Sequence, residues 1–195
     1  MSLVDSPSRT AAEEKLLAAA CDLLAEAGPR AASVRSIAAR AGVNHGLVHH
    51  YFGSKDALLR AAMSRLVREH AESARERSGG ELVPAPLGLV DQRRYLHAVV
   101  RCILDGEMDL ARTEIDEGVS VPQSTFAGMV ERRGATEPAV RLKAILGIGM
   151  AIEMGWAAVE PFIAAVAGIE TEGEMDEVRR EAVAIRNAIA REWFA

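Results

Sequence analysis

The segment from Ser33 to Phe52 constrains the fold of this chain most, because its residues favour two short helices joined by a tight turn. Ser33 has a side chain that can cap the first helix, and Gly42 can adopt the left-handed conformation that ends it. Asn44 is expected to cap the second helix, over residues 44–52. The small side chain of Ala38 lets the two helix axes come close together. The segment therefore predicts a helix-turn-helix.

The side chains expected on the outside of this motif are mostly hydrogen-bonding groups, and the second helix is too short to be stable alone. Such a helix fits the major groove of double-stranded DNA, where side chains contact base edges. The flanking helix N-termini, with their exposed amides and basic side chains, are suited to phosphates. The residues predicted to contact a double-stranded DNA operator are Ser33, Arg35, Asn44, His45, Gly46, Leu47, His49, His50, Tyr51 and Lys55.

The remaining sequence also has helical periodicity, and we find no stretch with the alternating pattern of a strand. A first helix is expected to begin at a capping box at Thr10 and to end at Gly28. Ser54 is expected to cap a fourth helix that extends to about Arg77. Further helices are predicted at about 91–105, 110–117, 123–133, 137–159, 161–167 and 173–194. The expected fold class is therefore all-α.

The charge of the chain differs between its two ends. The net charge of -5 for the whole chain disfavours nucleic acid as a partner. Residues 1–70, however, contain nine Lys and Arg against seven Asp and Glu, whereas residues 71–195 contain fourteen against twenty-one. Phosphate contacts need local positive charge, not a basic chain overall. The N-terminal third is therefore suited to DNA, while the remainder is acidic.

Four short motifs occur together in the first third of the chain. They are Ala18–Leu24 with Gly28, Ser33–Ala38, Ala41–Val43 and Tyr51–Leu58. In their order and spacing, residues 9–66 resemble the DNA-binding domain of tetracycline-repressor-type (TetR-type) regulators. The resemblance implies a bacterial, cytoplasmic repressor that binds a palindromic operator as a homodimer and is released by a small-molecule effector. Beyond these residues, only the length and the helical layout are similar to the family.

The resemblance also implies how the chain is divided. An N-terminal helix-turn-helix domain of three helices is expected over residues 1–55, and a C-terminal helical ligand-binding and dimerisation bundle over residues 56–195. Pro84, Pro86 and the run Ser78-Gly79-Gly80 indicate a linker. Helices at about 137–159 and 173–194 are expected to pair with those of a second copy as the homodimer interface.

The same resemblance implies roles for single residues of the motif. Ser33 and Lys55 match positions that bind phosphates, and Arg35 matches a position that reaches a base or a phosphate. Tyr51 belongs to the aromatic pair that closes the recognition helix. Family members often have Thr-Leu-Tyr where this chain has Leu47-Val48-His49. Leu47 can contact a thymine methyl group but cannot hydrogen-bond a base, and His49 replaces a phosphate-binding tyrosine.

The C-terminal two-thirds contains candidates for an effector pocket, because pockets between helices are apolar with a few polar anchors. Core packing explains each candidate equally well. Glu153 is the most suggestive, since a buried carboxylate needs a partner, either a cationic ligand or an arginine. The candidate pocket residues are Tyr95, Val99, Cys102, Met108, Phe126, Met129, Met150, Glu153, Met154 and Trp156.

Residues 144–169 are also apolar enough to raise the question of a membrane span. Glu153 and Glu160 lie within this segment, and acidic groups are expensive inside a bilayer. Pro161 also interrupts the helical pattern. Many of the other residues are small and suit close packing between helices, so a bundle helix is the preferred interpretation.

Other classes of function find little support in the sequence. It contains no phosphate-binding glycine loop, nucleophile elbow or zinc-protease motif, so we expect neither enzymatic activity nor a cofactor. His45 and His49 have a spacing that can bind a metal, but a metal there would block the face expected to contact DNA, and no metal is expected. Cys21 and Cys102 fit no disulfide framework or zinc spacing. Two alternatives remain: a helical protein-interaction module, and a repressor that needs no ligand.

Overall fold

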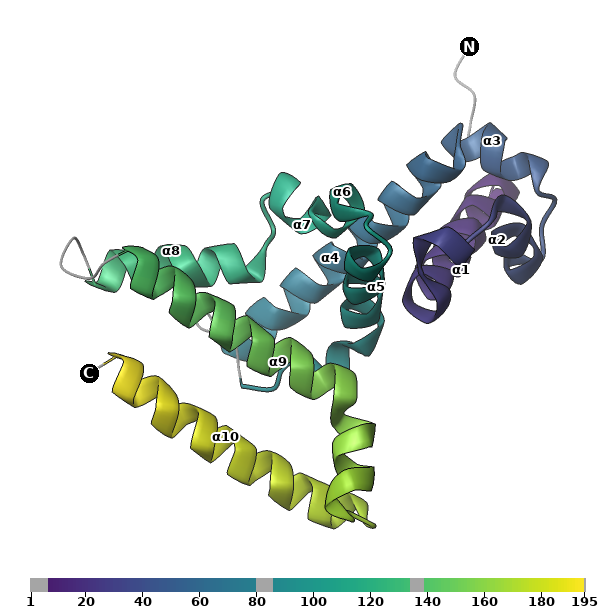
Figure 1. Ribbon diagram of the computed structural model, residues 1–195. Helices are drawn as coiled ribbons and strands as arrows, with labels where there is room; N and C mark the ends of the chain where they lie inside the picture. Colours follow the sequence, from purple (N-terminus) through teal and green to yellow (C-terminus); the bar gives the residue numbers. More distant parts are fainter. Residues whose placement is uncertain (1–6, 80–85, 134–138, 195) are drawn as a thin grey trace. The chain divides into compact units, whose positions relative to one another are not determined.

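The computed structural model describes residues 7–79, 86–133 and 139–194, with side chains described for residues 11–79, 86–131 and 139–188. Within these ranges the secondary structure is helical and contains no strand, which confirms the all-α fold class (Figure 1). The chain divides into two compact units. The first comprises residues 1–72 and 94–120, and the second comprises residues 73–93 and 121–195. The predicted division at residues 55 and 56 is a functional one and stays a prediction.

The first unit contains the predicted helix-turn-helix and the helices around it. Its elements are α1 (Pro7–Ala31), α2 (Val34–Ala41), α3 (Gly46–Phe52), most of α4 (Lys55–Ser78), α5 (Arg93–Leu104, from residue 94), α6 (Met108–Ala111) and α7 (Thr113–Asp116). Apolar side chains at helical spacing form the core because each helix buries one face. Leu16, Leu24, Ile37, Val48 and Leu58 are completely buried there. This core fixes α2 and α3 on α1.

The second unit contains the long helices of the chain. Its elements are the end of α4, η1 (Val90–Gln92), α8 (Val121–Arg133), α9 (Ala139–Ala167) and α10 (Glu172–Phe194). Helices α8 and α9 lie side by side, and α10 runs back along the unit after the bend at the end of α9 (Figure 1). The side chains that α9 buries include Leu142, Ala157 and Glu160.

Several predicted boundaries are wrong by a few residues. Helix α1 begins at Pro7, so Thr10 lies within the helix and does not cap it. The expected helix over 110–117 is two short helices separated at Arg112, where Thr113 Oγ1 donates to the Leu110 carbonyl (2.8 Å). Such side-chain bonds to the backbone compete with continuation of a helix.

Helix α9 continues through Pro161, where two helices were predicted. A proline removes one N–H donor and bends a helix without always ending it, and α9 bends in its last part (Figure 1). Helix α4 ends at Ser78, close to the prediction, and residues 80–85 of the expected linker lie outside the described residues.

In the part of the chain that the structure describes, α9 is one helix that is long and apolar enough to cross a membrane by length and composition alone. Only 11% of its most apolar window is buried within the chain. Exposed apolar surface on this scale is typical of a helix that contacts a membrane or another protein. The chemistry of the two faces of α9 distinguishes these alternatives.

Candidate nucleic-acid interface

The frame of the helix-turn-helix is set by two caps that the sequence predicted. The Ser36 N–H donates to Ser33 Oγ (3.0 Å), and the Ser33 N–H donates to Ser36 Oγ (2.9 Å), so the two serines form a reciprocal capping box. At the other end of α2, Gly42 has φ 66° and ψ 33°, and its N–H donates to the Ala39 carbonyl (3.2 Å). A Cβ at Gly42 would have no heavy atom within 4 Å. Glycine is therefore favoured there by the backbone angle and not by space.

Helix α3 begins at Gly46, two residues later than predicted. Asn44 still satisfies the start of the helix as predicted, because its Oδ1 accepts the Gly46 N–H (2.8 Å) at the first residue of α3. Val48 is completely buried against the rest of the first unit, which orients the helix. Val48 faces inward, whereas the next two residues of the helix, His49 and His50, are exposed.

The ten residues predicted to contact DNA come from the start of α2, the turn before α3, α3 itself and the start of α4. Leu47, Tyr51 and Lys55 are half-buried, and the other seven are exposed, namely Ser33, Arg35, Asn44, His45, Gly46, His49 and His50. The rings of His50 and Tyr51 meet edge to face, with centroids 4.9 Å apart. The structure leaves most of these residues accessible, and their contacts with DNA stay a prediction.

His49 has one nitrogen already engaged. Its Nδ1 lies 3.1 Å from the Gly53 carbonyl oxygen. A carbonyl can only accept, so this hydrogen bond requires that Nδ1 carries the proton. In the neutral ring Nε2 is then an acceptor, which suits the amino group of a base better than a phosphate. A phosphate contact through Nε2 requires the protonated ring.

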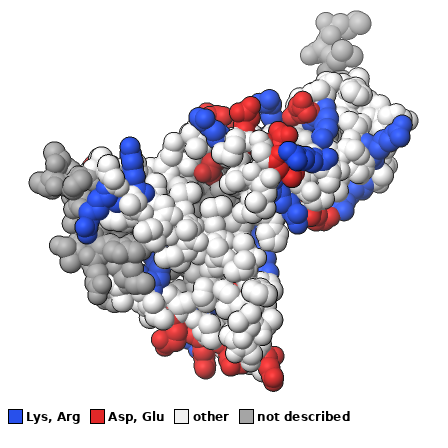
Figure 2. All heavy atoms as spheres, in the orientation of Figure 1, with Lys and Arg blue, Asp and Glu red and all other residues white. Residues whose placement is uncertain are grey.

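Lys55 contacts the backbone of α1. Its Nζ donates to the Pro29 carbonyl (3.0 Å), which joins the start of α4 to the end of α1. An ammonium group has three donors, so this bond leaves others for a phosphate. The visible face of the first unit has Lys and Arg interspersed with Asp and Glu (Figure 2). Arg40, for example, forms an ion pair with Glu26 (2.7 Å).

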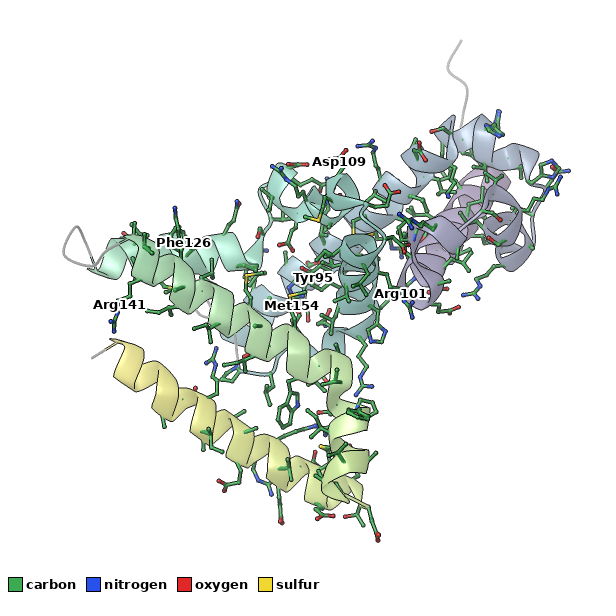
Figure 3. The ribbon with its side chains drawn as sticks, viewed as in Figure 1. Tyr95, Arg101, Asp109, Phe126, Arg141 and Met154 are labelled. Carbon is green, nitrogen blue, oxygen red and sulfur yellow. The ribbon has the colours of Figure 1, made fainter. Side chains whose placement is uncertain are left out.

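The ten predicted pocket residues are divided between the two units. Tyr95, Val99, Cys102 and Met108 belong to the first unit, whereas Phe126, Met129, Met150, Glu153, Met154 and Trp156 belong to the second (Figure 3 labels Tyr95, Phe126 and Met154). The second unit has a groove of about 410 Å³ lined by other residues, namely Pro86, Leu87, Val90, Asp91, Arg179, Arg180 and Val183. The predicted pocket therefore stays a prediction.

Tyr95 lies in a buried polar cluster of the first unit. Its hydroxyl donates to Glu114 Oε2, and Ser120 Oγ donates to Glu114 Oε1 (2.9 Å). The His70 ring stacks on the Tyr95 ring at a centroid distance of 3.9 Å. Burial, and then the Glu114 carboxylate, raise the pKa of Tyr95. These contacts connect α4, α5 and α7.

Glu153 and Glu160 both face inward from α9. Glu153 lies 3.5 Å from Arg186 Nη2 on α10, and its pKa is raised by burial. Glu160 is more buried and accepts hydrogen bonds from Arg93 (2.8 Å), Arg179 (2.8 and 2.9 Å) and Trp156 (3.1 Å). Arginine is therefore the partner of both carboxylates. Sequence reasoning singled out Glu153, although Glu160 is the one with the strongest set of partners.

Both cysteines are buried thiols. Burial raises the pKa of Cys21 to about 11 and that of Cys102 to about 12. Cys21 Sγ donates to the Ala62 carbonyl (3.4 Å), so this residue packs α1 on α4. Among the described residues no group of three or more His, Cys, Asp or Glu is arranged to bind a metal.

Comparisons with known proteins agree on the class of this chain. The family model described as "Bacterial regulatory proteins, tetR family" matches residues 16–62. The chain is 32% identical over 182 residues to the HTH-type transcriptional repressor Rv3405c of Mycobacterium tuberculosis, which covers 90% of this chain and 86% of that protein. It is 40% identical over 98 residues to the HTH-type transcriptional regulator BetI of Stenotrophomonas maltophilia, covering 49% of this chain and 43% of BetI.

A solved structure supports the fold. The crystal structure of a tetR-family transcriptional regulator from Streptomyces coelicolor matches this chain with a TM-score of 0.50 at 19% identity, covering 92% of this chain and 95% of the other. At that identity the likeness concerns the arrangement of helices alone. The family model covers only the N-terminal helices, whereas the similarity to Rv3405c extends over most of the chain.

Proposed function

This chain belongs to the TetR family of bacterial transcriptional regulators, and we propose that it is a cytoplasmic homodimeric repressor that a small-molecule effector releases from a palindromic operator. The observation that carries the proposal is the exposed polar surface of α2 and α3 on a rigid frame of buried core residues and caps. A surface of this kind loses little order when it enters a groove, so binding costs little conformational entropy.

One copy of this surface is too small for selective binding. Helix α3 has 7 residues and can contact only a few base pairs. Two copies related by a two-fold axis double the number of contacts on a palindromic site. Selective binding by this chain therefore favours a dimer.

The outward face of α9 supplies an apolar surface for a second copy. Its exposed side chains include Ile148 (48%), Val159 (45%), Phe162 (69%) and Val166 (71%). At Gly147 and Gly155 an added Cβ would have no heavy atom within 4 Å, so another backbone has room to approach. Between residues 144 and 159 the one charged side chain is Glu153, which faces inward towards Arg186. We propose this face, with α10, as the homodimer interface.

Charge on the other face of α9 argues for a protein partner and against a membrane. Glu160 is paired with two arginines, and Glu153 lies beside a third. If α9 crossed a bilayer, these charged groups would lie in the hydrocarbon, which is energetically unfavourable. One apolar face and one ionic face suit a helix between its own unit and a second copy.

Release by an effector is the most specific part of the proposal. Two observations support it. A relative that matches most of this chain, Rv3405c, is named a repressor. Glu114 and Glu153, beyond the helix-turn-helix, also place carboxylates inside the protein, where they could anchor a ligand. A ligand that binds better to a dimer with displaced recognition helices shifts the population to that state and lowers the affinity for DNA.

DNA binding can be tested by fluorescence anisotropy with a labelled duplex from the region upstream of this protein's own gene. We expect tighter binding to this duplex than to a scrambled one, and affinity that falls as the salt concentration rises. Arg35→Ala should weaken binding, and Arg112→Ala, an exposed arginine on the α6–α7 side of the first unit, serves as the matched control. Equal affinity for both duplexes would contradict the proposal and favour a protein-interaction module.

The effector can be sought by adding small-molecule libraries to the same DNA complex. A compound that lowers the anisotropy and raises the melting temperature of the free protein supports effector control, because a ligand stabilises the state that it binds. If selective DNA binding is present and no compound alters it, the protein is a ligand-independent repressor.

A further inference from the structure

Helix α1 contains a break at Gly28, just before the helix-turn-helix. Gly28 has φ 81° and ψ 171°, which are not helical angles, and Pro29 begins a last turn that closes with a bond from the Ala32 N–H to the Gly28 carbonyl (3.2 Å). A Cβ at Gly28 would lie 2.9 Å from Asp105 Oδ2 and 3.3 Å from Arg101 Cβ. Glycine is therefore required here both by the backbone angle and by the close approach of another element.

That element is the C-terminal end of α5. Arg101 Nε donates to the Ala25 carbonyl (2.9 Å), on one side of the break. Asp105 Oδ2 accepts the Arg30 N–H (3.3 Å), on the other side. Arg101 and Asp105 are one turn apart, and the Asp105 N–H donates to the Arg101 carbonyl (2.9 Å). The last turn of α5 and the residue that follows it thus bond both sides of the break (Figure 3 labels Arg101).

A second contact fixes the position of α5 along α1. Arg94 Nη2 lies 3.2 Å from the Ala18 carbonyl and 2.7 Å from Asp22 Oδ1. The acceptors Ala18 and Ala25 are seven residues apart on α1, and the donors Arg94 and Arg101 are seven residues apart on α5. Seven residues are about two turns, or roughly 10 Å of helix. The two arginines therefore set the register of α5 on α1.

The other side of the break is bonded by α4 through Lys55 and the Pro29 carbonyl (3.0 Å). The chain then passes through Ala32, which is completely buried, to Ser33, the cap of α2. Only two residues separate Arg30 from Ser33. The direction in which α2 leaves α1 is thus determined where α4 and α5 both bond the backbone.

We propose that Arg101 and Asp105 are positioning residues for DNA binding, which hold the Gly28 break in the geometry that places α2 and α3 correctly in the groove. This inference rests on the proposed function. Neighbouring positions on α5 carry Tyr95, Val99 and Cys102, which are buried in the core of the first unit. A shift of α5 that breaks its register on α1 therefore moves the start of α2 and lowers the affinity for the operator.

Two variants with the same change of charge test the proposal in the full chain. Asp105→Asn weakens the acceptor at the break, whereas Asp109→Asn removes the same charge from an exposed residue of the next helix, α6. Removing a negative charge strengthens binding to DNA by simple electrostatics. We expect Asp109→Asn to bind the upstream duplex as tightly as the unchanged protein or more tightly, and Asp105→Asn to bind about tenfold more weakly, with the slope of affinity against salt unchanged.

Hydrogen exchange of the free protein supplies a readout that does not depend on DNA. The amides of residues 30–36 should exchange faster in Asp105→Asn than in Asp109→Asn, while the melting temperatures of the two variants stay similar. Asp105→Glu, which retains the carboxylate, should recover part of the DNA affinity. Gly28→Ala should weaken binding less when it is combined with Asp105→Ala than the separate losses predict, because the close approach is removed.

Equal DNA affinity of Asp105→Asn and Asp109→Asn, or equal exchange at residues 30–36, would overturn the role of Asp105. Absence of selective DNA binding by the unchanged protein would instead overturn the proposed function, and the exchange measurement would still decide whether Asp105 orders the break. If Gly28→Ala does not fold, the two asparagine variants remain sufficient.

Discussion

Helices α3 and α9 both expose a face, but the two faces have opposite chemistry. Among the 7 residues of α3, Gly46, His49 and His50 are exposed, so two imidazole rings dominate this face. The exposed face of α9 is apolar along most of its 29 residues. The first surface can stay in water until it meets a charged, hydrated polymer. The second is costly in water and needs a partner that covers it for long periods.

The two faces suit complexes of different lifetime. A polar surface on a short, rigid helix can bind and release DNA, with affinity set by salt and by a few hydrogen bonds. An apolar surface of the length of α9 suits a permanent contact between copies. The following changes test whether the faces are as different as their chemistry indicates.

The largest effect is expected from a charge on the outward face of α9. Ile148→Glu should raise the dissociation constant of the homodimer by at least about a hundredfold, or roughly 3 kcal/mol, because the carboxylate would be buried without a partner. Analytical ultracentrifugation measures the shift from dimer to monomer. Ile115→Glu, which places the same charge on an exposed apolar residue of α7, is the matched control. A dimer of unchanged stability in Ile148→Glu would mean that α9 is not the interface.

A comparable loss is expected on the inward face of α9. Glu160→Gln should lower the free energy of unfolding by about 3 kcal/mol, because it leaves the guanidinium groups of Arg93 and Arg179 without their buried partner. Urea unfolding of both proteins, followed by circular dichroism at several protein concentrations, separates this loss from dissociation of the dimer.

The same residue gives the pH dependence. The Arg179 guanidinium, together with Trp156 and Arg93, lowers the pKa of Glu160 in the folded chain from its ordinary value of 4.5. The stabilisation is therefore fully present above about pH 4.5 and is lost as the pH falls through the lower folded value. Glu160→Gln should make stability less sensitive to acid in this range. An unchanged pH profile would show that the ion pairs contribute nothing to folding.

On the α3 face a moderate effect is expected from His49. His49→Ala should lower affinity for the upstream duplex by roughly 1–3 kcal/mol if Nε2 accepts a hydrogen bond from a base. The affinity for a scrambled duplex should change less at neutral pH. If both duplexes lose affinity equally, His49 contacts a phosphate and its role in selecting sequence is wrong.

The smallest effect is expected at the turn between α2 and α3. Gly42→Ala should lower the free energy of unfolding by about 1 kcal/mol, because alanine is strained at φ 66° while no atom obstructs its Cβ. Gly42→Asn should lose less, since asparagine tolerates this conformation better. Thermal unfolding of the two variants checks the order. A much larger loss would indicate that the space above Gly42 is needed for packing.

The parts of the fold that could be predicted depend on residues close together in the sequence. Ser33, Gly42 and Ser54 act on backbone groups within four residues, and each has the predicted role in ending or starting a helix. Asn44 shows the limit of such reasoning for the position of a boundary. Its side chain bonds an amide two residues ahead, as an Asx turn does, so α3 starts later than a simple cap predicts.

The parts that could not be predicted depend on distant partners. Glu160 meets Arg93 and Arg179 only after the helices have packed, and of its partners only Trp156, four residues earlier, is close in the sequence. Asp105 lies 75 residues from Arg30, whose backbone N–H donates a hydrogen bond to it. The local signal is Gly28, a glycine followed by proline within a helical pattern, and this pattern by itself predicts only a helix end.

The burial of the two cysteines has a practical consequence. With pKa values of about 11 and 12, Cys21 and Cys102 have roughly one thiolate in 10,000 or fewer at pH 7, and both side chains are completely buried. The native thiols of the folded protein should therefore react very slowly with thiol-reactive dyes and spin labels. A single cysteine introduced at an exposed position of α3 or α9 can be labelled selectively without first removing the native thiols, and distances between such labels would test the proposed homodimer.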